Sequence, residues 1–359
     1  MDTARRVSEL RKVIEAEALD GMLVSSVPNV TYLSAFTGDD SLALVTPDRL
    51  AIITDFRYVE QVEQECPGWE VVRREKDLWQ TTAAAVTESG VRRLGFETAH
   101  LSHAGFRKLT DVLGDVEVVP LEGKVETLRQ IKDAREVRAI EAALRCQEAA
   151  FAEVKACVRP GMTERQVACE LDYRMRRHGA EQSAFETIVA CGERGSLPHA
   201  RATERVISQG DAVLVDWGAR CFFYNSDLTR LLHVGTVSGE FEKVYHIVRQ
   251  AQNEALAVIR PGVKLCEVDG AARAVIRDRG YGERFGHSLG HGVGLEVHES
   301  PVVRERNEEP VQPGMVFTIE PGIYIPGWGG VRIEDMVLVT DDGVRVLSDC
   351  EKDLDGIVV

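Results

Sequence analysis

The sequence lacks paired cysteines, an excess of basic charge and any long apolar run. Its eight cysteines are scattered without a CxxC pair, and a chain of 359 residues does not depend on a disulfide framework, so a reducing compartment is expected. Lys and Arg total 43 against 58 Asp and Glu, a formal charge of -15, and a surface of this sign repels phosphate backbones. No stretch approaches the ~18 consecutive apolar residues of a membrane span, and the first residues lack the apolar core of a signal peptide. These absences predict a soluble, cytoplasmic protein that binds neither nucleic acid nor membranes.

The chain contains enough hydrophobic residues to form the cores of two folded domains. Hydrophobic residues make up 44% of the chain and charged residues 28%, and at about 150 residues per domain the length predicts two domains. In residues 1–125, short apolar runs alternate with amphipathic segments, which predicts an α/β domain. Pro47 and Asp48 indicate a tight turn between the second and third runs. The predicted strands are GMLVSS, SLALVT, LAIITD, WEVV, RRLGFE and VEVVPL, and the predicted helices span residues 3–19, 57–66, 77–89 and 102–113.

The second predicted domain, residues 126–359, contains an internal repeat. It opens with a long predicted helix, for which Asp133 is the N-cap and Glu136 follows three residues later. The segment VRPGMTERQVACELDYRMRRHGAE, from Val158, resembles IRPGVKLCEVDGAARAVIRDRGYGE, from Ile259, at a displacement of 101 residues. This period is too long for a solenoid unit. It predicts two related α/β halves that face each other across a pseudo-two-fold axis.

Each half delivers two acidic residues at strand ends. The runs AVLVD and MVFTIE end in Asp216 and Glu320, and the following runs FFYNSD and VRIED end with Asp227 and include Glu334. Neighbouring antiparallel strands hold opposite side chains ~5 Å apart on one face, so the four carboxylates would converge between the halves. Carboxylates that close together repel each other unless they take up protons or bind cations. A single acid is usually a surface residue, but four acids in duplicated positions predict a metal site.

Three of the nine histidines lie in one Gly-rich segment, FGHSLGHGVGLEVHESP. They are His287, His291 and His298. Glycines let the backbone approach a compact site closely, and neutral imidazole serves both as a metal ligand and as a proton shuttle near neutral pH. A lone histidine is more often a structural residue, but three within twelve residues indicate a functional cluster. The alternation from Val293 to His298 predicts a strand after His291.

These motifs resemble those of the pita-bread metallopeptidases, in particular the Xaa-Pro branch that contains prolidase and aminopeptidase P. The resemblance covers essentially the whole chain and is carried by VDWGARCFFYNSDLTR, GHSLGHGVGLEVHESP, FTIEPGIY and GVRIED. It implies an α/β (α+β) fold class, with a creatinase-like N-terminal α/β domain ahead of a pseudo-two-fold pita-bread domain. It also implies two divalent metal ions per subunit, and the oxygen-rich ligand set favours Mn²⁺ or Co²⁺, with Zn²⁺ as a further candidate. The five implied ligands are Asp216, Asp227, His291, Glu320 and Glu334.

The resemblance implies further site residues. A hydroxide formed from water between the two ions is the expected nucleophile, and Glu320 is expected to carry the proton to the leaving nitrogen. His298 is expected to hold the scissile carbonyl and His199 to position substrate. His287 and Arg332 complete the implied catalytic set, with Arg332 beside the metal-side carboxylates or the substrate. Closeness in sequence to these residues suggests a proline pocket lined by Phe185, Leu197, Tyr224 and Tyr324.

The expected activity is hydrolysis of Xaa-Pro dipeptides. One departure concerns the substrate carboxylate: archaeal-type prolidases hold it with an arginine four residues beyond the position of His298, where this chain has Val302. Arg304 and Arg57 are alternatives that the sequence leaves open. The alternative activities are those of aminopeptidase P, acting on longer peptides with proline second, of a methionine aminopeptidase, and of a non-catalytic binding homologue. The resemblance also implies a homodimer.

Overall fold

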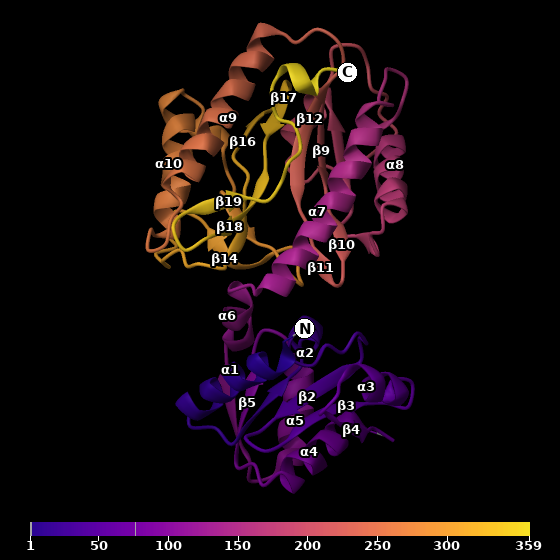
Figure 1. The fold of residues 1–359 in the computed structure, drawn as a ribbon, viewed down its shortest axis with the longest axis vertical. Coiled ribbons are helices and arrows are strands. Elements are labelled where there is room, and N and C mark those ends of the chain that lie inside the picture. The colour runs from indigo at the N-terminus through magenta and orange to yellow at the C-terminus, as the bar shows by residue number, and fades with distance from the viewer. Residues whose placement is uncertain (1, 76) are drawn as a thin grey trace. The chain divides into compact units, whose positions relative to one another are not determined.

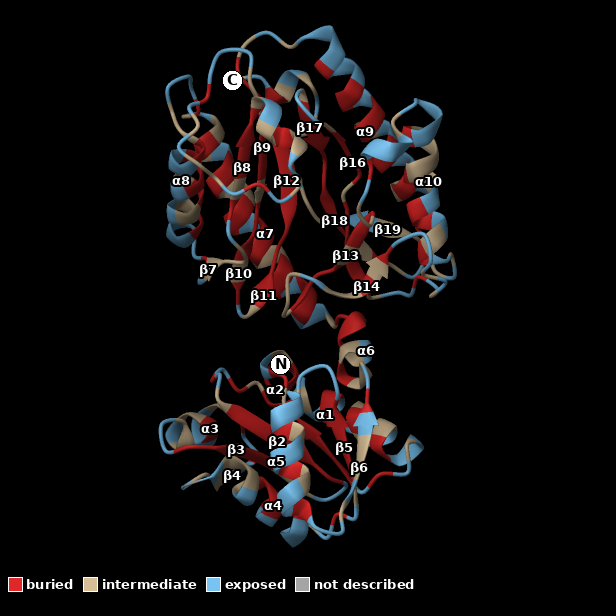
Figure 2. Cartoon of the chain, turned by 180° about the vertical axis from the view of Figure 1, so that it is seen from behind, coloured by how far each residue is buried: buried red, intermediate tan, exposed pale blue. Residues whose placement is uncertain are grey.

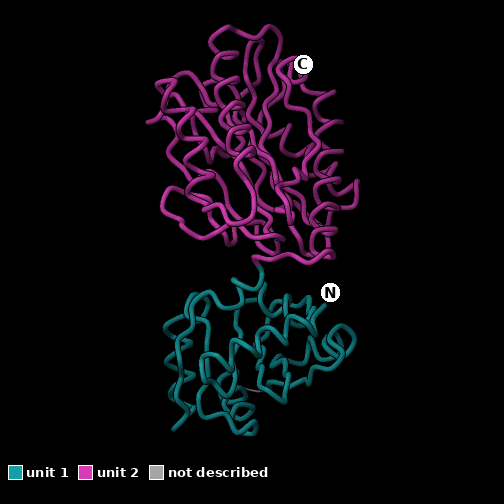
Figure 3. The backbone as a smooth tube through the Cα atoms, turned by 60° about the vertical axis from the view of Figure 1, so that its left-hand side comes forward, with its two compact units in different colours: residues 1–129 teal, residues 130–359 magenta. Residues whose placement is uncertain are grey.

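The computed structural model describes residues 2–75 and 77–359 and divides the chain into two compact units, residues 1–129 and 130–359 (Figure 3). The division falls within helix α6 (Lys124–Gln130), a few residues beyond the predicted boundary at residue 125. Buried residues run along the strands of both units, so each unit has an interior of its own (Figure 2). Within the described residues, no helix is both long enough and apolar enough to cross a membrane.

The first unit is built on a mixed six-stranded sheet in the order β4-β3-β2-β1-β5-β6. All six strands match predicted runs, and β2 and β3 form the antiparallel hairpin expected from the turn at Pro47 and Asp48. Strand β1 pairs antiparallel with β2 and parallel with β5. The unit is therefore α/β, as predicted. Its strands are β1 (Gly21–Val24), β2 (Ser41–Val45), β3 (Leu50–Thr54), β4 (Glu70–Arg73), β5 (Arg93–Glu97) and β6 (Glu117–Leu121).

Helix α2 (Val27–Ser34) of the first unit was not predicted, and neither was the boundary helix α6. Helix α2 has Pro28 in its first turn, and six of its eight residues are buried. Burial on all sides removes the alternation of polar and apolar faces by which an amphipathic helix is recognised. The four predicted helices are present as α1 (Thr3–Ala16), α3 (Val59–Glu65), α4 (Leu78–Glu88) and α5 (His103–Leu113).

The second unit begins with the predicted long helix, α7 (Ala134–Lys155). The Asp133 carboxylate accepts hydrogen bonds from the N–H groups of Arg135 and Glu136, and the Glu136 carboxylate accepts one from Asp133 N–H. This is the expected capping box. Helix α7 and helix α8 (Glu164–Arg177) pack on one face of an antiparallel sheet. The strands of that sheet are β8 (Ile188–Cys191), β9 (Ala212–Trp217) and β12 (Leu228–His233).

The second half of this unit repeats the first. Helices α9 (Gly239–Val258) and α10 (Leu265–Asp278) pack on a second sheet, and α10 begins 101 residues after α8. The order β8-β9-β12 recurs as β13-β15-β18 within the five-stranded sheet β14-β13-β15-β18-β19. The two helix pairs lie on opposite sides of the strands (Figure 1). The strands are β13 (Gly290–Gly292), β14 (Glu299–Val303), β15 (Val316–Ile319), β18 (Asp335–Val339) and β19 (Val344–Val346).

The repeat extends to individual hydrogen bonds. The N–H of Gly161 donates to the carbonyl of Ile207 at 3.0 Å, and the N–H of Gly262 donates to that of Val311 at 2.9 Å. The φ angles of the two glycines are 95° and 88°, a left-handed conformation that glycine adopts without steric cost. The two Arg-Pro-Gly motifs therefore make the same turn ahead of α8 and α10.

Short elements complete the second unit, and one of them differs from prediction. Residues 293–298, predicted as a strand, form a series of bends, and strand β14 starts only at Glu299. The reason is the pairing of β13 with β14, which are antiparallel with Gly292 opposite Glu299, so residues 293–298 must reverse the chain between them. The remaining elements are β7 (Gln182–Ser183), β10 (Ala219–Cys221), β11 (Tyr224–Asn225), β16 (Gly322–Ile325), β17 (Gly329–Arg332) and the 3-10 turns at 192–196, 282–284 and 355–357.

The hairpin between β10 and β11 makes its turn with two unfavourable residues. Phe222 and Phe223 have φ angles of 52° and 68°, and Phe222 is 67% exposed. A two-residue turn with both φ angles positive favours Asn-Gly, and a bulky residue in this conformation costs about 1–2 kcal/mol. We expect the variant Phe222→Asn/Phe223→Gly to raise the free energy of unfolding by about 1–2 kcal/mol, as measured by denaturant titration. The Glu181 carboxylate accepts both turn N–H groups, at 2.8 and 3.3 Å, and keeps these bonds in the variant. A loss of stability would mean that the phenylalanine rings contribute more than their backbone strain costs.

Candidate metal centre

Four acidic side chains reach one place from the two halves of the second unit. Asp216 lies in β9 and Glu320 directly follows β15, whereas Asp227 and Glu334 directly precede β12 and β18. Side chains alternate between the two faces of a strand. Because Val215 enters the core beside α7 and α8, Asp216 points to the opposite face of the sheet.

The ligand atoms of these acids and of His291 form overlapping groups. Within each group the ligand atoms lie within 4.8 Å of one another: Asp216, Asp227 and Glu334 form one group, and His291, Glu320 and Glu334 form another. Nε2 of His291 is 3.3 Å from Glu320 Oε1 and 3.6 Å from Asp227 Oδ2. The structure thus brings together all five residues that the sequence suggested as ligands.

The four buried carboxylates are unfavourable as anions unless positive charge is added beside them. Burial, and then the neighbouring carboxylates, raise the pKa values of Asp227 and Glu334 well above their ordinary range, and burial also raises the pKa of Asp216. Burial opposes ionisation of Glu320 too, but the hydrogen bond and charge of His291 lower its pKa to about 2. Burial likewise works against the charge on His291, yet Glu320 raises the pKa of this imidazole to about 9. The His291 imidazole and the Arg332 guanidinium carry at most two positive charges against four acids, so the cluster holds its full negative charge only beside added cations.

Two oxygens of the cluster are available to a cation. Among the described residues, Asp216 Oδ1 and Glu334 Oε1 are buried without a hydrogen-bond partner. The other oxygen of each is held, Asp216 Oδ2 by Arg332 Nη2 at 2.7 Å and Glu334 Oε2 by the Thr229 hydroxyl at 2.8 Å. Buried polar atoms are rarely left unpaired, and four carboxylates with one imidazole suit divalent ions that prefer oxygen. The residues present therefore fit a divalent-metal site.

Both units match known families. Residues 6–131 match the Creatinase/Prolidase N-terminal domain, and residues 138–341 match metallopeptidase family M24. The chain belongs to metallopeptidase family M24. It is 42% identical to the uncharacterized peptidase YqhT of Bacillus subtilis over 349 residues, 97% of this chain and 99% of the relative. The solved structure of an Xaa-Pro dipeptidase from Bacillus anthracis has a TM-score of 0.96 at 39% identity and covers 100% of both chains. That of an X-Pro aminopeptidase from Thermotoga maritima has a TM-score of 0.91 at 37% identity, covering 99% of this chain and 100% of the other.

Membership in family M24 confirms three predictions. The chain is a metallopeptidase, and its fold joins a creatinase-like N-terminal domain to a pita-bread domain. The family also implies binding of divalent metal, in agreement with the ligand groups in the structure.

Arg332 holds the M24 acid cluster in place. Its Nη2 donates to Asp216, its Nε donates to the Thr229 hydroxyl at 2.8 Å, and its Nη1 donates to the Tyr324 hydroxyl at 2.9 Å. The Tyr324 hydroxyl is in turn 2.9 Å from Nε2 of His287. This places Arg332 beside the metal-side carboxylates, the first of the two positions expected for it, and adds Tyr324 and His287 to the same network.

Two threonines of the site were missed from the sequence. Thr229 accepts from Arg332 and donates to Glu334. Thr318 accepts from the N–H of His291 at 3.1 Å and donates to Glu320 Oε1 at 3.2 Å. Thr229 lies directly opposite Asp216 in the β9–β12 register, and Thr318 lies two residues before Glu320. Strand alternation was the signal that could have found them, since residues two apart share a face.

Of the other predicted histidines, His298 lies beside His291. The His298 ring centroid is 4.2 Å from that of His291, and a ligand group joins His298 with Asp227 and His291. Burial and the charge of His291 lower the pKa of His298, and His199 contributes to the same lowering. Burial lowers the pKa of His287. His298 and His199 are both exposed at the surface and so are accessible to a substrate.

The structure separates the predicted proline-pocket residues. Tyr324 lies in the Arg332 network, and a Cβ on Gly218 would lie 2.7 Å from the Phe185 ring, which places Phe185 beside the turn after β9. Leu197 is 50% exposed. Tyr224 is instead 3% exposed within the core beside α7 and α8. Its hydroxyl donates to Glu136 at 2.9 Å, so closeness in sequence to Asp227 did not translate into a place at the site.

Replacing Tyr224 with phenylalanine tests this placement. We expect the free energy of unfolding to fall by about 1–3 kcal/mol, because a buried hydrogen bond to a carboxylate is lost. Peptidase kinetics should be unchanged. The matched control is Tyr324→Phe, which removes a hydroxyl that contacts His287 and Arg332 and should lower kcat. Thermal denaturation and steady-state kinetics of both variants check the pair, and a specific loss of proline preference in Tyr224→Phe would return Tyr224 to the pocket.

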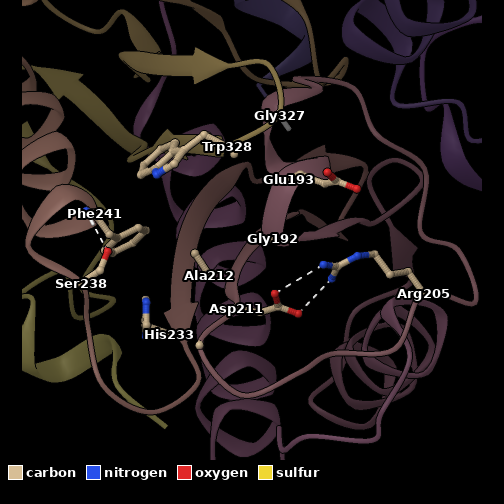
Figure 4. Close-up of a pocket in the computed structure, with 13 residues that line it drawn as sticks. Gly192, Glu193, Arg205, Asp211, Ala212, His233, Ser238, Phe241, Gly327 and Trp328 are labelled. Carbon is tan, nitrogen blue, oxygen red and sulfur yellow. Dashed lines mark hydrogen bonds and ion pairs between the residues drawn. The ribbon is translucent and has the colours of Figure 1, made fainter.

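A hollow separate from the acid cluster, called the second hollow below, lies at the end of β9 away from Asp216 (Figure 4). Its volume is about 340 Å³, and it is lined on one side by Arg205, paired with Asp211 at 2.9 Å, and on the other by Phe241 and Trp328. None of the site residues predicted above, all within the described ranges, lines it. Along β9, the buried Leu214 stands between this hollow and Asp216. The hollow is therefore separate from the acid cluster.

Proposed function

We propose that this M24 metallopeptidase hydrolyses the peptide bond before proline, with Xaa-Pro dipeptides as its main substrates. The observation that carries the proposal is the convergence of four carboxylates and His291 from the two halves of the second unit. The similar solved structures named Xaa-Pro dipeptidase and X-Pro aminopeptidase support the choice of bond.

The proposed metal ligands are Asp216, Asp227, His291, Glu320 and Glu334, which would hold two divalent ions, with Mn²⁺ or Co²⁺ favoured by the oxygen-rich set. When bound, such ions polarise a carbonyl and lower the pKa of water toward neutrality. Without metal, burial opposes ionisation of Glu320 but charged His291 lowers its pKa to about 2. Bound cations would likewise favour the carboxylate form, which is able to accept a proton at an oxygen. The same carboxyl group then donates that proton to the leaving nitrogen.

The remaining proposed residues orient the reaction. His298, exposed beside His291, would donate a hydrogen bond to the scissile carbonyl oxygen as negative charge develops on it. His199 would position the substrate from the same side. Arg332 fixes Asp216, and His287 joins the same network through Tyr324, so these three residues preserve the shape of the acid cluster.

Proline specificity is proposed to come from shape. The nitrogen of an Xaa-Pro bond carries a ring and no hydrogen, so a site that needs an N–H donor rejects it. Phe185 and Leu197 are the proposed apolar pocket residues, and Tyr324 would contribute its ring from within the Arg332 network. The position of Val302, opposite His291 across β13 and β14, supplies no positive charge for a substrate carboxylate. Arg304 follows two residues later and is exposed.

The deciding experiment compares two substrates. Metal-stripped protein is assayed on an Xaa-Pro dipeptide and on an Xaa-Pro-Yaa-Yaa tetrapeptide, with and without Mn²⁺, Co²⁺ or Zn²⁺, and an Xaa-Ala dipeptide serves as the control. Metal-restored cleavage of the Xaa-Pro dipeptide alone is the expected result. Efficient cleavage of the tetrapeptide would instead establish an aminopeptidase. Cleavage of neither, with metal bound, would overturn the assignment to Xaa-Pro bonds.

We further propose that the enzyme works as a cytoplasmic homodimer. All eight cysteines are free thiols in the structure, which suits a reducing compartment. Sedimentation equilibrium of the purified chain would give its oligomeric state, and a monomer would contradict the proposal.

A further inference from the structure

A buried ion pair reaches into the loop that carries His298. Lys132 Nζ lies 2.8 Å from Glu299 Oε1, and the two side chains are only 1% and 4% exposed. Lys132 is itself fixed, because its N–H donates to the carbonyl of Gly314 at 2.9 Å directly ahead of α7. A buried ion pair adds little net stability compared with apolar residues of similar size. Stability alone therefore does not account for this pair.

The Glu299 carboxylate lies against the inside of the loop. Its Oε2 accepts the N–H of Glu296 at 3.3 Å, and a Cβ on Gly294 would lie 2.4 Å from Oε1. Only glycine lets a carboxylate come this close to the backbone. The carboxylate thus defines the path of the chain between His291 and His298.

Asn225 holds the same loop from a second strand. It is 3% exposed, and its backbone N–H donates to the carbonyl of Gly294 at 2.8 Å. Its side-chain amide donates to the carbonyls of Gly294 and Leu295, both at 3.0 Å. Because both the Glu299 carboxylate and the Asn225 amide hold residues 294–296, the loop has little freedom to shift.

We propose that Lys132 and Glu299 are positioning residues, which place His298 beside the metal-ligand cluster through the loop at residues 293–298. This inference rests on the proposed function, in which His298 holds the substrate carbonyl. A displacement of about 1 Å in such a group costs up to about 100-fold in rate. Loss of the pair should therefore lower kcat while the ligands of the metal ions remain in place.

The test removes both charges together. Removing one partner would leave the other charge buried and unpaired, which threatens folding. The variant is therefore Lys132→Met/Glu299→Gln, loaded with Mn²⁺. We expect a melting temperature and a metal content close to those of the wild type, with kcat on an Xaa-Pro dipeptide about 10- to 100-fold lower. The control, Arg205→Met/Asp211→Asn, removes the ion pair of the second hollow and should leave kcat unchanged. A wild-type kcat in Lys132→Met/Glu299→Gln would overturn the proposal.

A second comparison asks whether the pair acts through His298. In a His298→Ala background, the Lys132→Met/Glu299→Gln change should cost little further activity, because the group that it positions is already absent. A purely structural role predicts instead that the two losses multiply. Multiplied losses would rule out the route through His298.

Hydrogen exchange supplies a readout that needs no substrate. Amide exchange at residues 293–299 should be faster in Lys132→Met/Glu299→Gln than in the wild type, with α7 and α9 unchanged. Equal exchange at these residues would overturn the inference even if the wild type cleaves Xaa-Pro peptides. If the wild type cleaves none, the proposed function fails and the exchange result still decides whether the pair orders the loop.

Discussion

Replacing Glu320 with glutamine is expected to lower kcat on an Xaa-Pro dipeptide by about 10²- to 10⁴-fold, the usual contribution of a general acid–base group. Although burial opposes its ionisation, Glu320 is a carboxylate at neutral pH beside charged His291 in the metal-free protein, and bound cations would favour the same form. An amide of nearly the same shape has no basic oxygen to take a proton and none to return to the leaving nitrogen. The change should therefore affect kcat more than KM.

Metal content must be measured with the kinetics, because Glu320 is also a proposed ligand. Glu320→Asp keeps the charge but shortens the side chain, so it should retain metal better than the glutamine variant. Glu193→Gln is the matched control, since it alters an exposed carboxylate in the second hollow and should leave kcat unchanged. A glutamine variant with full metal content and near-wild-type kcat would assign the proton transfer to another group.

Metal removal is expected to reverse the pH dependence of stability. In the metal-free protein, burial and neighbouring carboxylates raise the pKa values of Asp227 and Glu334 well above the ordinary value near 4. Between the ordinary and the raised values, the folded state binds more protons than the unfolded state. The free energy of unfolding should then fall as pH rises through this window. With metal bound, protons compete with the ions for the same oxygens, so stability should rise with pH instead.

Thermal denaturation from about pH 5 to pH 8, with chelator or with Mn²⁺, checks both slopes. Metal at 100 times its dissociation constant should add about 2.7 kcal/mol, because it binds the folded state alone. The variant Glu193→Gln again serves as the control and should follow the wild type in both series. Stability of the metal-free protein that increased steadily with pH would mean that the four acids do not share one site in solution.

The acid cluster could be predicted because its members are repeated in the chain. Asp216 and Glu320 each end a strand in matching halves, so sequence order alone indicates that they meet. Glu299 and Lys132 have no such signal, since 167 residues separate the two partners of the buried ion pair. For Tyr224 the signal in the sequence was misleading. Its closeness to Asp227 suggested a place in the proline pocket, but the strand directs its ring into the core.

Local patterns were reliable where one physical effect dominated. The strands of the first unit follow from their apolar runs, and the capping box of α7 follows from Asp133 and Glu136. Helix α2 and the bends at residues 293–298 were missed because tertiary packing, not local periodicity, decides their conformation.

The matching strands of the two halves differ in one instructive place. The displacement of 104 residues that relates Asp216 to Glu320 also relates Leu214 to Thr318. Leu214 pairs with Ala190 in the first half, whereas Thr318 receives the N–H of His291 in the second. The two halves are therefore not equivalent at this place: the first half packs an apolar pair into the core, and the second uses Thr318 to fix the backbone of His291, the one nitrogen ligand on which the proposed chemistry depends.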